Sequence, residues 1–439
     1  MNLKPATLLL ALLALLAGCV AVAPAQQAAV PVAAPTTTSL AGHLWLVADA
    51  AALVAGVPPL PTLLPEPPPP PPDAALLEQW REPASRWMEA ELRAITAEWS
   101  DPPHAARALM LLGVAMNDAL VVAEAARAQG LEVSDHAASA EAASRVLAYT
   151  HPLLDGAASG ERETATWAGV WRGEATVAGV LNGRNLGAAV AEKVLAWAAA
   201  DGAADSTPLF VLPAVAPGVW APTAPDYELP QEPSWSRVRT VAIGDPASVR
   251  TPAPPAWGSS EMEAQLTAFA EAQAALTDEQ RTLVRTWASG AGTITPPGLW
   301  VRIAQQLVAT HKLAPAEAAG LYAALGVALH DAAVACWESK YHYMLARPVQ
   351  ALRERNPAFA PLLKTPPHPS YPSGHASFSG AASELLAAAF PEAAAALRQQ
   401  ASDAARSRVY GGIHWPIDGE AGLAQGARVA QLVLGKLEH

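Results

Sequence analysis

Apolar residues recur with helical spacing along most of this chain, and this periodicity restricts its fold more than any other feature. Alternating apolar and polar residues, the mark of a half-buried β-strand, are nearly absent. Hydrophobic residues make up 51% of the sequence and charged residues only 15%, a balance that suits a packed helical protein and argues against disorder. The sequence therefore predicts an all-α protein. The helical pattern covers residues 105–127, 185–199, 262–289, 299–310, 315–345 and 417–437.

The sequence of one long apolar helix occurs twice. The pattern Leu-Gly-Val-Ala-x-x-Asp runs over residues 112–118 and again over residues 325–331. A second set of matches, at a spacing of 239 residues, pairs His136 with His375. Alanine-rich helices match one another easily, so convergent helices are the alternative, but the shared aspartate favours a duplication. We therefore expect two pseudo-repeated helical bundles.

The repeated helix carries Asp118 in the first copy and Asp331 in the second, each within an otherwise apolar run. A buried carboxylate needs hydrogen-bond partners, and the same place in both copies suits a shared scaffold role. We expect both aspartates to be packing or capping partners rather than catalysts. The polar pairs 117–118 and 330–331 also interrupt the longest apolar runs after the first residues, so no transmembrane helix is expected there.

The first residues are typical of an export signal. Lys4 precedes an apolar run that ends in Leu-Ala-Gly-Cys at Cys19, which predicts a lipoprotein signal peptide over residues 1–18 and a lipidated Cys19. Ordinary signal cleavage after Ala25 is the alternative. We expect an exported protein that contacts the membrane only through an N-terminal lipid anchor and faces the periplasm or the cell exterior; without the lipid it would be secreted and soluble.

Proline-rich stretches mark the expected domain boundaries. Residues 19–75 are rich in Ala and Pro and predict an extended tether. Residues 76–212 form the first helical half, which we expect to be a degenerate copy. A Pro-rich connector over residues 213–258 leaves no room for regular helices and leads to the second helical half, residues 259–439, which is expected to carry the active site.

Two cations open the chemically informative part of the chain. Lys340 and Arg347 are seven residues apart, nearly two helical turns, so they are expected to project from one helix face before Pro348 ends that helix. Two long cations on one face can grip a tetrahedral oxyanion. A lysine and an arginine at this spacing more commonly form a solvated face, so this motif alone is weak.

A Pro-Ser-Gly-His segment forms the second part of the pattern. Ser373 and Gly374 precede an apolar-periodic helix, so they predict a hydroxyl and an unobstructed backbone N–H at a helix N-terminus. This arrangement is suited to holding an anion. His375 lies in the first turn, where it can exchange a proton with an outer oxygen of that anion.

The third part supplies another cation and a second imidazole. Arg408 can make bidentate contacts with oxygen atoms. His414 lies just before Pro416, a favoured first-turn residue, so the next helix begins beside it. Asp418 can accept a hydrogen bond from one ring nitrogen of His414 and leave the other nitrogen free as a ligand or nucleophile.

Taken in order, the three segments are Lys-x6-Arg-Pro, Pro-Ser-Gly-His and Ser-Arg-x5-His-x3-Asp. This series resembles the signature of the vanadium haloperoxidase and type 2 phosphatidic acid phosphatase (PAP2) superfamily, without a departure at any position. The resemblance to the soluble haloperoxidase-like branch extends more loosely over residues 80–438. It implies the all-α fold of that superfamily.

The resemblance also implies a role for each residue. His414 matches the position that bonds to vanadium or attacks phosphorus, His375 matches the acid–base group, and His368 lies where haloperoxidases carry an aromatic or a second histidine. The first copy has Gly169 and Ala175 opposite Arg408 and His414, so we expect it to be catalytically empty. The residues implied to bind vanadate or phosphate oxygens are Lys340, Arg347, Ser373, Gly374 and Arg408.

The same cage suits two reactions. With vanadate as cofactor, the chain would be a haloperoxidase that uses hydrogen peroxide to oxidise halide or another small nucleophile. Without a cofactor, it would be an acid phosphatase that hydrolyses phosphomonoesters through a phosphohistidine at His414. A catalytically inactive exported lipoprotein is a third alternative. His368 and the helix-rich, duplicated architecture favour the haloperoxidase.

The charge of the chain limits its partners. A formal net charge of -12 argues against nucleic acid, because phosphate backbones are held by basic surfaces. Any anionic substrate must therefore meet a local cationic pocket. The expected partners are small molecules, with a homodimer as a possibility drawn by analogy.

Overall fold

The computed structural model describes residues 40–57, 68–204 and 210–438. The predicted signal peptide at residues 1–18, the lipidation of Cys19 and the first part of the predicted tether lie outside the described residues. The prediction of an all-α protein is confirmed, because the described residues form helices and connecting loops without a β-strand. One isolated antiparallel bridge joins Val219 to Leu345.

The first half of the chain contains seven α-helices in the described residues, of which α5 is the longest. Asp101 caps the N-terminus of α5 by accepting a hydrogen bond from the backbone N–H of His104, and Pro102 and Pro103 occupy its first turn. The bounds are α2 Ala50–Gly56, α3 Ala74–Glu78, α4 Pro83–Ala97, α5 Pro102–Ala128, α6 Asp135–Thr150, α7 Asp155–Trp171 and α8 Val177–Ala199, with a 3₁₀ turn η1 at Pro152–Leu154.

The second half follows after two 3₁₀ turns in the connector, η2 Trp235–Arg237 and η3 Pro246–Val249. Its longest helix, α12, matches α5. The bounds are α9 Ser260–Ala274, α10 Asp278–Thr286, α11 Thr295–His311, α12 Pro315–Tyr343, α13 Pro348–Arg355, α14 Gly374–Ala389, α15 Ala394–Tyr410 and α16 Pro416–Leu437, with a 3₁₀ turn η4 at Pro391–Ala393.

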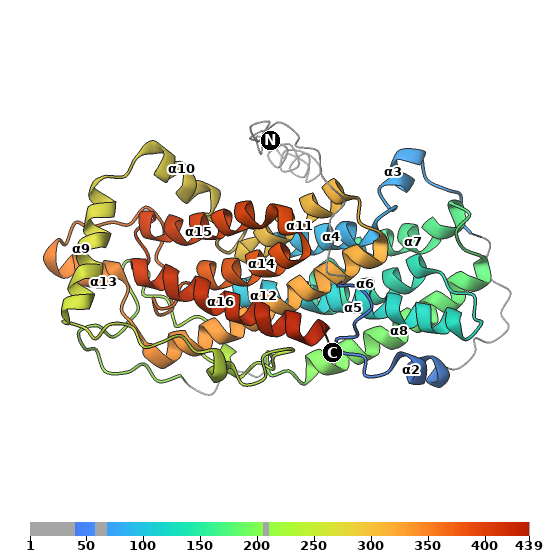
Figure 1. The fold of residues 1–439 in the computed structure, drawn as a ribbon, viewed down its shortest axis with the longest axis horizontal. Coiled ribbons are helices and arrows are strands. Elements are labelled where there is room, and N and C mark those ends of the chain that lie inside the picture. Colours follow the sequence, from blue (N-terminus) through green and yellow to red (C-terminus); the bar gives the residue numbers. More distant parts are fainter. Residues whose placement is uncertain (1–39, 58–67, 205–209, 439) are drawn as a thin grey trace, which may run out of the picture. The chain divides into compact units, whose positions relative to one another are not determined.

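Helices α5 and α12 pack against each other at the centre of the fold (Figure 1). Each brings a glycine to the crossing. A Cβ at Gly113 would lie 2.8 Å from the carbonyl oxygen of Tyr322, and a Cβ at Gly326 would lie 2.7 Å from the Cα of Met110. The two backbones approach closely only because neither position carries a side chain, so the repeated Leu-Gly-Val-Ala pattern marks the contact between the two halves.

The duplication extends to the helices on either side of this pair. Helix α6 packs against α8 in the first half, and α14 packs against α16 in the second (Figure 1). A Cβ at Gly187 would lie 2.2 Å from the carbonyl oxygen of Ala138, and a Cβ at Gly426 would lie 2.1 Å from that of Ser377. Both members of each glycine–carbonyl pair are 239 residues from their counterparts, so the prediction of two pseudo-repeated bundles is confirmed.

The two repeated aspartates hold loops against the central helices. The carboxylate of Asp118 accepts hydrogen bonds of 3.0–3.1 Å from three consecutive backbone N–H groups, those of residues 45–47. Asp331 does the same for residues 241–243, at 2.7–3.0 Å. Both carboxylates are fully buried. Each carboxylate accepts the hydrogen bonds of a turn whose backbone N–H groups would otherwise lack an acceptor. This is the scaffold role predicted from sequence.

Helices α5 and α12 are long and apolar enough to cross a membrane by length and composition alone. In α5 83% of the most apolar window is buried inside the protein, and in α12 the whole window is buried. That burial is typical of core helices that are apolar because neighbouring helices surround them.

Two predicted boundaries differ from the structure. The tether expected over residues 19–75 does not extend through residues 40–57, because Leu40, Val47 and Val54 are buried in the core and the loop before α2 is bound by Asp118. The tether was predicted from the alanine- and proline-rich composition of the whole stretch, which does not distinguish these few buried side chains.

Pro348 also does not end a helix that carries Arg347. Helix α12 ends at Tyr343, Met344 adopts a left-handed conformation with φ 52°, and Pro348 begins α13. The prediction of one shared helix face for Lys340 and Arg347 is therefore wrong. Proline at a helix start is as common as proline after a helix end, and the spacing alone could not distinguish them.

Replacing Asp331 by alanine is expected to lower the free energy of unfolding by at least about 3 kcal/mol, because one buried and two partly buried N–H groups lose their acceptor. Asp331→Asn retains one acceptor oxygen and should lose less. Denaturant unfolding of the full chain measures both changes. The exposed pair of Asp403 with Arg406 gives the control, since Asp403→Ala should change stability by less than about 0.5 kcal/mol. Equal effects at positions 331 and 403 would contradict the scaffold role.

Candidate active site

Residues of the second and third chemically informative segments line one cavity of about 430 Å³. Apolar side chains such as Trp337, Leu363 and Phe378 form much of its wall, and Glu228 and Lys364 also line it. Lys340, Arg347 and Ser373 do not line the cavity themselves. Gly374, His375, Arg408 and His414 of the second and third segments line it, together with His368, which precedes the second segment.

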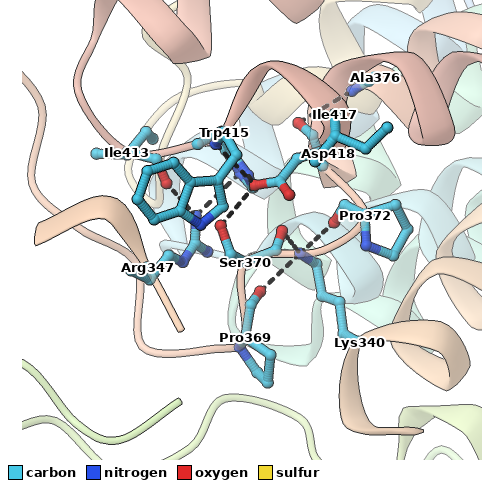
Figure 2. A network of polar contacts seen from close by, with 12 residues as sticks. Lys340, Arg347, Pro369, Ser370, Pro372, Ala376, Ile413, Trp415, Ile417 and Asp418 are labelled. Carbon is cyan, nitrogen blue, oxygen red and sulfur yellow. Dashed lines mark hydrogen bonds and ion pairs between the residues drawn. The ribbon is translucent and has the colours of Figure 1, made fainter. Parts of the chain in front are cut away.

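Lys340 lies in the last turn of α12 and is completely buried. Its ammonium group donates to the backbone carbonyls of Pro369 at 2.8 Å and Ser370 at 3.1 Å, and also to that of Pro372 (Figure 2). Three carbonyl acceptors match the three N–H donors of an ammonium group. Lys340 therefore fixes the loop that leads to Ser373, and its charge lies behind the cavity wall.

Arg347 is the N-cap residue of α13, and its guanidinium group connects two segments of the site. Nε donates to the carbonyl of His368 at 2.9 Å and Nη2 contacts Nδ1 of the same residue at 3.0 Å. Nη1 donates to the carbonyl of Ile413 at 2.7 Å (Figure 2) and contacts Nε2 of His414 at 3.0 Å. The planar fork of donors therefore sets the relative positions of the two histidines.

The second segment begins α14. Ser373 is its N-cap, and its hydroxyl accepts a hydrogen bond from the backbone N–H of Ala376. The N–H of Gly374 belongs to the first turn, where a helix has no carbonyl of its own to offer. Because Gly374 lines the cavity, this donor and the positive end of the helix are available to an anion.

His414 and Asp418 form a directed pair beside the start of α16. Nδ1 of His414 lies 2.8 Å from Oδ2 of Asp418. The same oxygen accepts from the backbone N–H of Trp415 at 3.0 Å and from the hydroxyl of Ser370 (Figure 2). An ionised carboxylate only accepts, so Nδ1 carries the proton and Nε2 carries the lone pair. The lone pair faces a donor of Arg347.

Arg408, in the last turn of α15, is held least firmly of the three cations. Its Nε donates to the hydroxyl of Ser407 at 3.0 Å, and Nη2 contacts the carbonyl of Val284 at 3.4 Å. No carboxylate pairs with it among the described residues. Burial lowers the pKa of Arg408 to about 9, so it is still cationic at neutral pH.

The electrostatics of the site favour an anion. Burial lowers the pKa of Lys340 to about 7 and that of Arg347 to about 10, while burial raises the pKa of Asp418 to about 6. Burial and the neighbouring cations keep the pKa of His375 and of His414 well below the usual range, so both imidazoles are neutral at pH 7. Among the described residues, Asp418 is thus the one buried carboxylate beside Arg347 and Arg408, which are cationic at pH 7, and Lys340, which is about half protonated there. A bound anion would supply the missing negative charge.

Several residues at the site were not identified from sequence. Ser370 supports Asp418, Trp337 stacks near His368 with ring centroids 5.1 Å apart, and Ser289 contacts His375. Trp337 is buried and also lines the cavity. Only its position three residues before Lys340, nearly one helical turn, placed it near the site.

The first half lacks an equivalent site in its described residues. His136 occupies the position of His375 at the start of α6, but its ring contacts the carboxylate of Glu174 at 3.4 Å. A Cβ at Gly169 would lie 3.2 Å from the ring of His136 and 3.3 Å from Ala175. Small residues therefore fill the space where the second half has Arg408 and His414.

Comparison with known proteins agrees with this geometry. Residues 318–437 match the model of the PAP2 superfamily. Vanadium chloroperoxidase of Curvularia inaequalis is 32% identical over 117 residues, which cover 21% of this chain and 19% of that protein. The chain thus matches about a fifth of the length of this curated relative.

The fold is similar to solved structures over a much greater length. A bacterial vanadium-dependent iodoperoxidase superposes with a TM-score of 0.71 at 24% identity, covering 80% of this chain and 95% of the other. The holo form of a bacterial vanadium-dependent chloroperoxidase superposes with a TM-score of 0.59 at 16% identity, covering 78% and 92%. The described fold is therefore that of the vanadium haloperoxidases.

A tetrahedral oxyanion is expected to stabilise the protein, because it compensates the buried cations only in the folded state. At one hundred times its dissociation constant, phosphate or vanadate should add about 2.7 kcal/mol to the free energy of unfolding. Thermal unfolding with phosphate, compared with chloride at equal ionic strength, measures the effect. Arg408→Met should abolish most of it. Arg406→Met, two residues earlier on the same helix and exposed, should retain it; loss of the effect in both variants would contradict the site.

Proposed function

We propose that this chain is a vanadate-dependent haloperoxidase-like enzyme, because residues 318–437 match the PAP2 superfamily model and the fold is that of the vanadium haloperoxidases. It uses hydrogen peroxide to oxidise halide or another small nucleophile. The observation that carries the proposal is the orientation of His414. Its Nδ1 is bound to Asp418, its Nε2 lone pair faces a donor of Arg347, and the residue lines a cavity that Arg408 also lines.

The residues fit vanadate as a cofactor. Coordination to vanadium needs a neutral imidazole with a free lone pair, and the carboxylate of Asp418 fixes His414 in that tautomer. The oxygens of a tetrahedral anion need donors and positive charge, which Arg347, Arg408 and the N–H of Gly374 offer. Vanadate, when bound, supplies the Lewis-acid centre at which peroxide is activated toward halide.

Each residue then has a separate task. His414 would hold vanadium through Nε2, and Arg347 would turn the donor that now faces Nε2 toward an oxygen of the anion. Arg408, which has only one long contact to a carbonyl, would face the anion from α15. His375 would exchange the proton at the oxygen that points into the cavity, since its neutral ring can accept that proton at pH 7. Lys340 would keep the Ser373 loop in place and contribute its charge.

An acid phosphatase is the second candidate, because phosphate and vanadate share shape and charge. The same Nε2 lone pair of His414 would attack phosphorus, and His375 in its protonated form would donate the Nδ1 proton to the leaving oxygen. The cavity of about 430 Å³ has room for the organic group of a phosphomonoester. The haloperoxidase is preferred because the two similar solved structures described above are vanadium-dependent peroxidases.

We also propose that the protein is exported and anchored by lipid at Cys19. The proposal rests on the apolar run and the Leu-Ala-Gly-Cys sequence that precedes it. A mature protein that carries lipid at Cys19 supports it, and mass spectrometry of the purified N-terminus can detect that lipid.

Both activities should be assayed on one sample of the full chain. After incubation with vanadate, the protein is expected to oxidise iodide with hydrogen peroxide, and the activity should be lost on removal of vanadate. Hydrolysis of p-nitrophenyl phosphate by the vanadate-free protein would instead support the phosphatase. His414→Ala should lower either activity by at least about a hundredfold, because it removes the ligand or nucleophile.

His342→Ala provides the matched control, since His342 is exposed and close to Lys340 in sequence without contacting the cavity. It should retain wild-type rates. A folded protein that binds the anion but has neither activity would contradict both enzyme proposals. The chain would then be an anion-binding protein.

A further inference from the structure

The C-terminal end of α10 contacts the site from a part of the chain that lies before the three motif segments. Carbonyl groups at a helix C-terminus have no N–H partner within the helix. Here the carbonyl of Trp287, the C-cap residue, lies 3.1 Å from Nε2 of His375, and that of Val284 lies 3.4 Å from Arg408. This end of α10 therefore binds two site residues that come from different helices.

Ser289 completes the contact with His375. Its hydroxyl oxygen lies 3.2 Å from Nε2 of His375 and 3.3 Å from the carbonyl oxygen of Trp287. The side chain is buried, with 5% of its surface exposed, and it lines the cavity. One ring nitrogen is thus faced by two oxygen atoms of the same short segment.

This geometry determines which ring nitrogen of His375 can exchange a proton with the oxyanion. A backbone carbonyl only accepts, so a hydrogen bond to Trp287 requires a proton on Nε2. The neutral ring then carries its lone pair on Nδ1. Nε2 keeps its proton in both the neutral and the protonated ring, so its two oxygen partners can hold the ring in place while Nδ1 gains or loses a proton.

In the first copy, His136 is the counterpart of His375, and among the described residues its ring lacks the two oxygen partners on Nε2. His136 has its Nε2 beside the carboxylate of Glu174 at 3.4 Å, and its Nδ1 is buried without a hydrogen-bond partner in the described part of the chain. Neither nitrogen of His136 meets a serine hydroxyl and a carbonyl together. The pair of oxygens on Nε2 is therefore a feature of the second half, where the site lies.

Packing ties the segment to the helix that carries His375. The rings of Trp287 and Trp300 lie 6.0 Å apart, and Nε1 of Trp300 donates to the hydroxyl of Ser379 at 2.9 Å. Ser379 belongs to α14, one turn after His375. The carbonyl of Trp287 is thus fixed relative to His375 by buried contacts, and the Ser289 hydroxyl is the part of this contact that a substitution can remove.

We propose that Ser289 is a positioning residue for His375: with the Trp287 carbonyl, it holds Nε2 and presents Nδ1 to the bound oxyanion. The inference rests on the proposed function, in which His375 is the acid–base group. Ser289 itself touches neither the substrate nor the cofactor in this role. It acts through the orientation of the ring.

Steady-state kinetics of Ser289→Ala tests the proposal in the vanadate-loaded full chain. A well-placed acid–base group contributes about 10²–10⁴-fold to a rate, so loss of one of its two positioning contacts should lower kcat for iodide oxidation about tenfold. The KM for iodide should change by less than about twofold, because no binding group is removed. Ser289→Thr retains the hydroxyl and should restore most of kcat.

Ser383→Ala is the matched control. Ser383 is buried on the same helix as His375, and its hydroxyl contacts the carbonyl of Gly380. The same change in side chain there should leave kcat unaltered. A kcat of Ser289→Ala within about twofold of wild type, or equal losses in Ser289→Ala and Ser289→Thr, would overturn the proposal.

NMR spectroscopy tests the positioning role of Ser289 independently of the proposed enzymatic activity. In the vanadate-free protein labelled with ¹⁵N-histidine, His375 should show Nε2 protonated and Nδ1 unprotonated, with assignment from His375→Gln. Ser289→Ala should shift these signals toward the average of the two tautomers, while Ser383→Ala should not. If the wild type oxidises no halide, the proposed function fails. Unchanged His375 signals in Ser289→Ala would then overturn the positioning role independently.

Discussion

Three cations buried beside a single carboxylate form the constraint on which the rest of the site depends. Taking a charged group out of water costs several kcal/mol unless partners replace the lost hydration. Lys340 has three carbonyls, and Arg347 has two carbonyls and two imidazoles. Arg408 has the hydroxyl of Ser407 and one long carbonyl contact. The compensation is therefore least complete at Arg408, which lines the cavity. An oxyanion bound there completes the charge balance, and this explains why a strongly acidic chain can hold an anionic group.

A rigid scaffold is needed to keep such charges together, and the duplicated fold provides it. Close glycine contacts lock α5 to α12 and α14 to α16, so the helix ends that carry Lys340, Ser373 and Asp418 cannot move independently. Asp331 fixes the connector against α12 in the way that Asp118 fixes residues 45–47 against α5. The first copy retains this scaffold while small residues occupy the place of the catalytic groups.

The helical class, the duplication and the scaffold role of both aspartates could be predicted from sequence because each leaves a periodic or repeated pattern. The motif residues could be grouped from sequence because their order along the chain is distinctive, and in the structure Gly374, His375, Arg408 and His414 line one cavity. Their roles in binding and catalysis stay a prediction. The turn between α12 and α13 could not be predicted, because Pro348 suits a helix start as well as an interruption. The anchoring of residues 40–57 and the contact of Ser289 with His375 depend on tertiary packing. Neither leaves a local sequence pattern, because nothing in the neighbouring residues distinguishes a buried valine in an alanine-rich stretch or a serine after a helix from an exposed one.

The most direct measurement is a crystal structure of the full chain grown with orthovanadate. The account predicts one vanadate per chain at bonding distance from Nε2 of His414, with Nη1 of Arg347 turned from that nitrogen to a vanadate oxygen and Asp418 still bound to Nδ1. A cavity in which Nε2 remains bound to Arg347 while vanadate lies elsewhere on the protein would contradict the central claim that these residues form one oxyanion site.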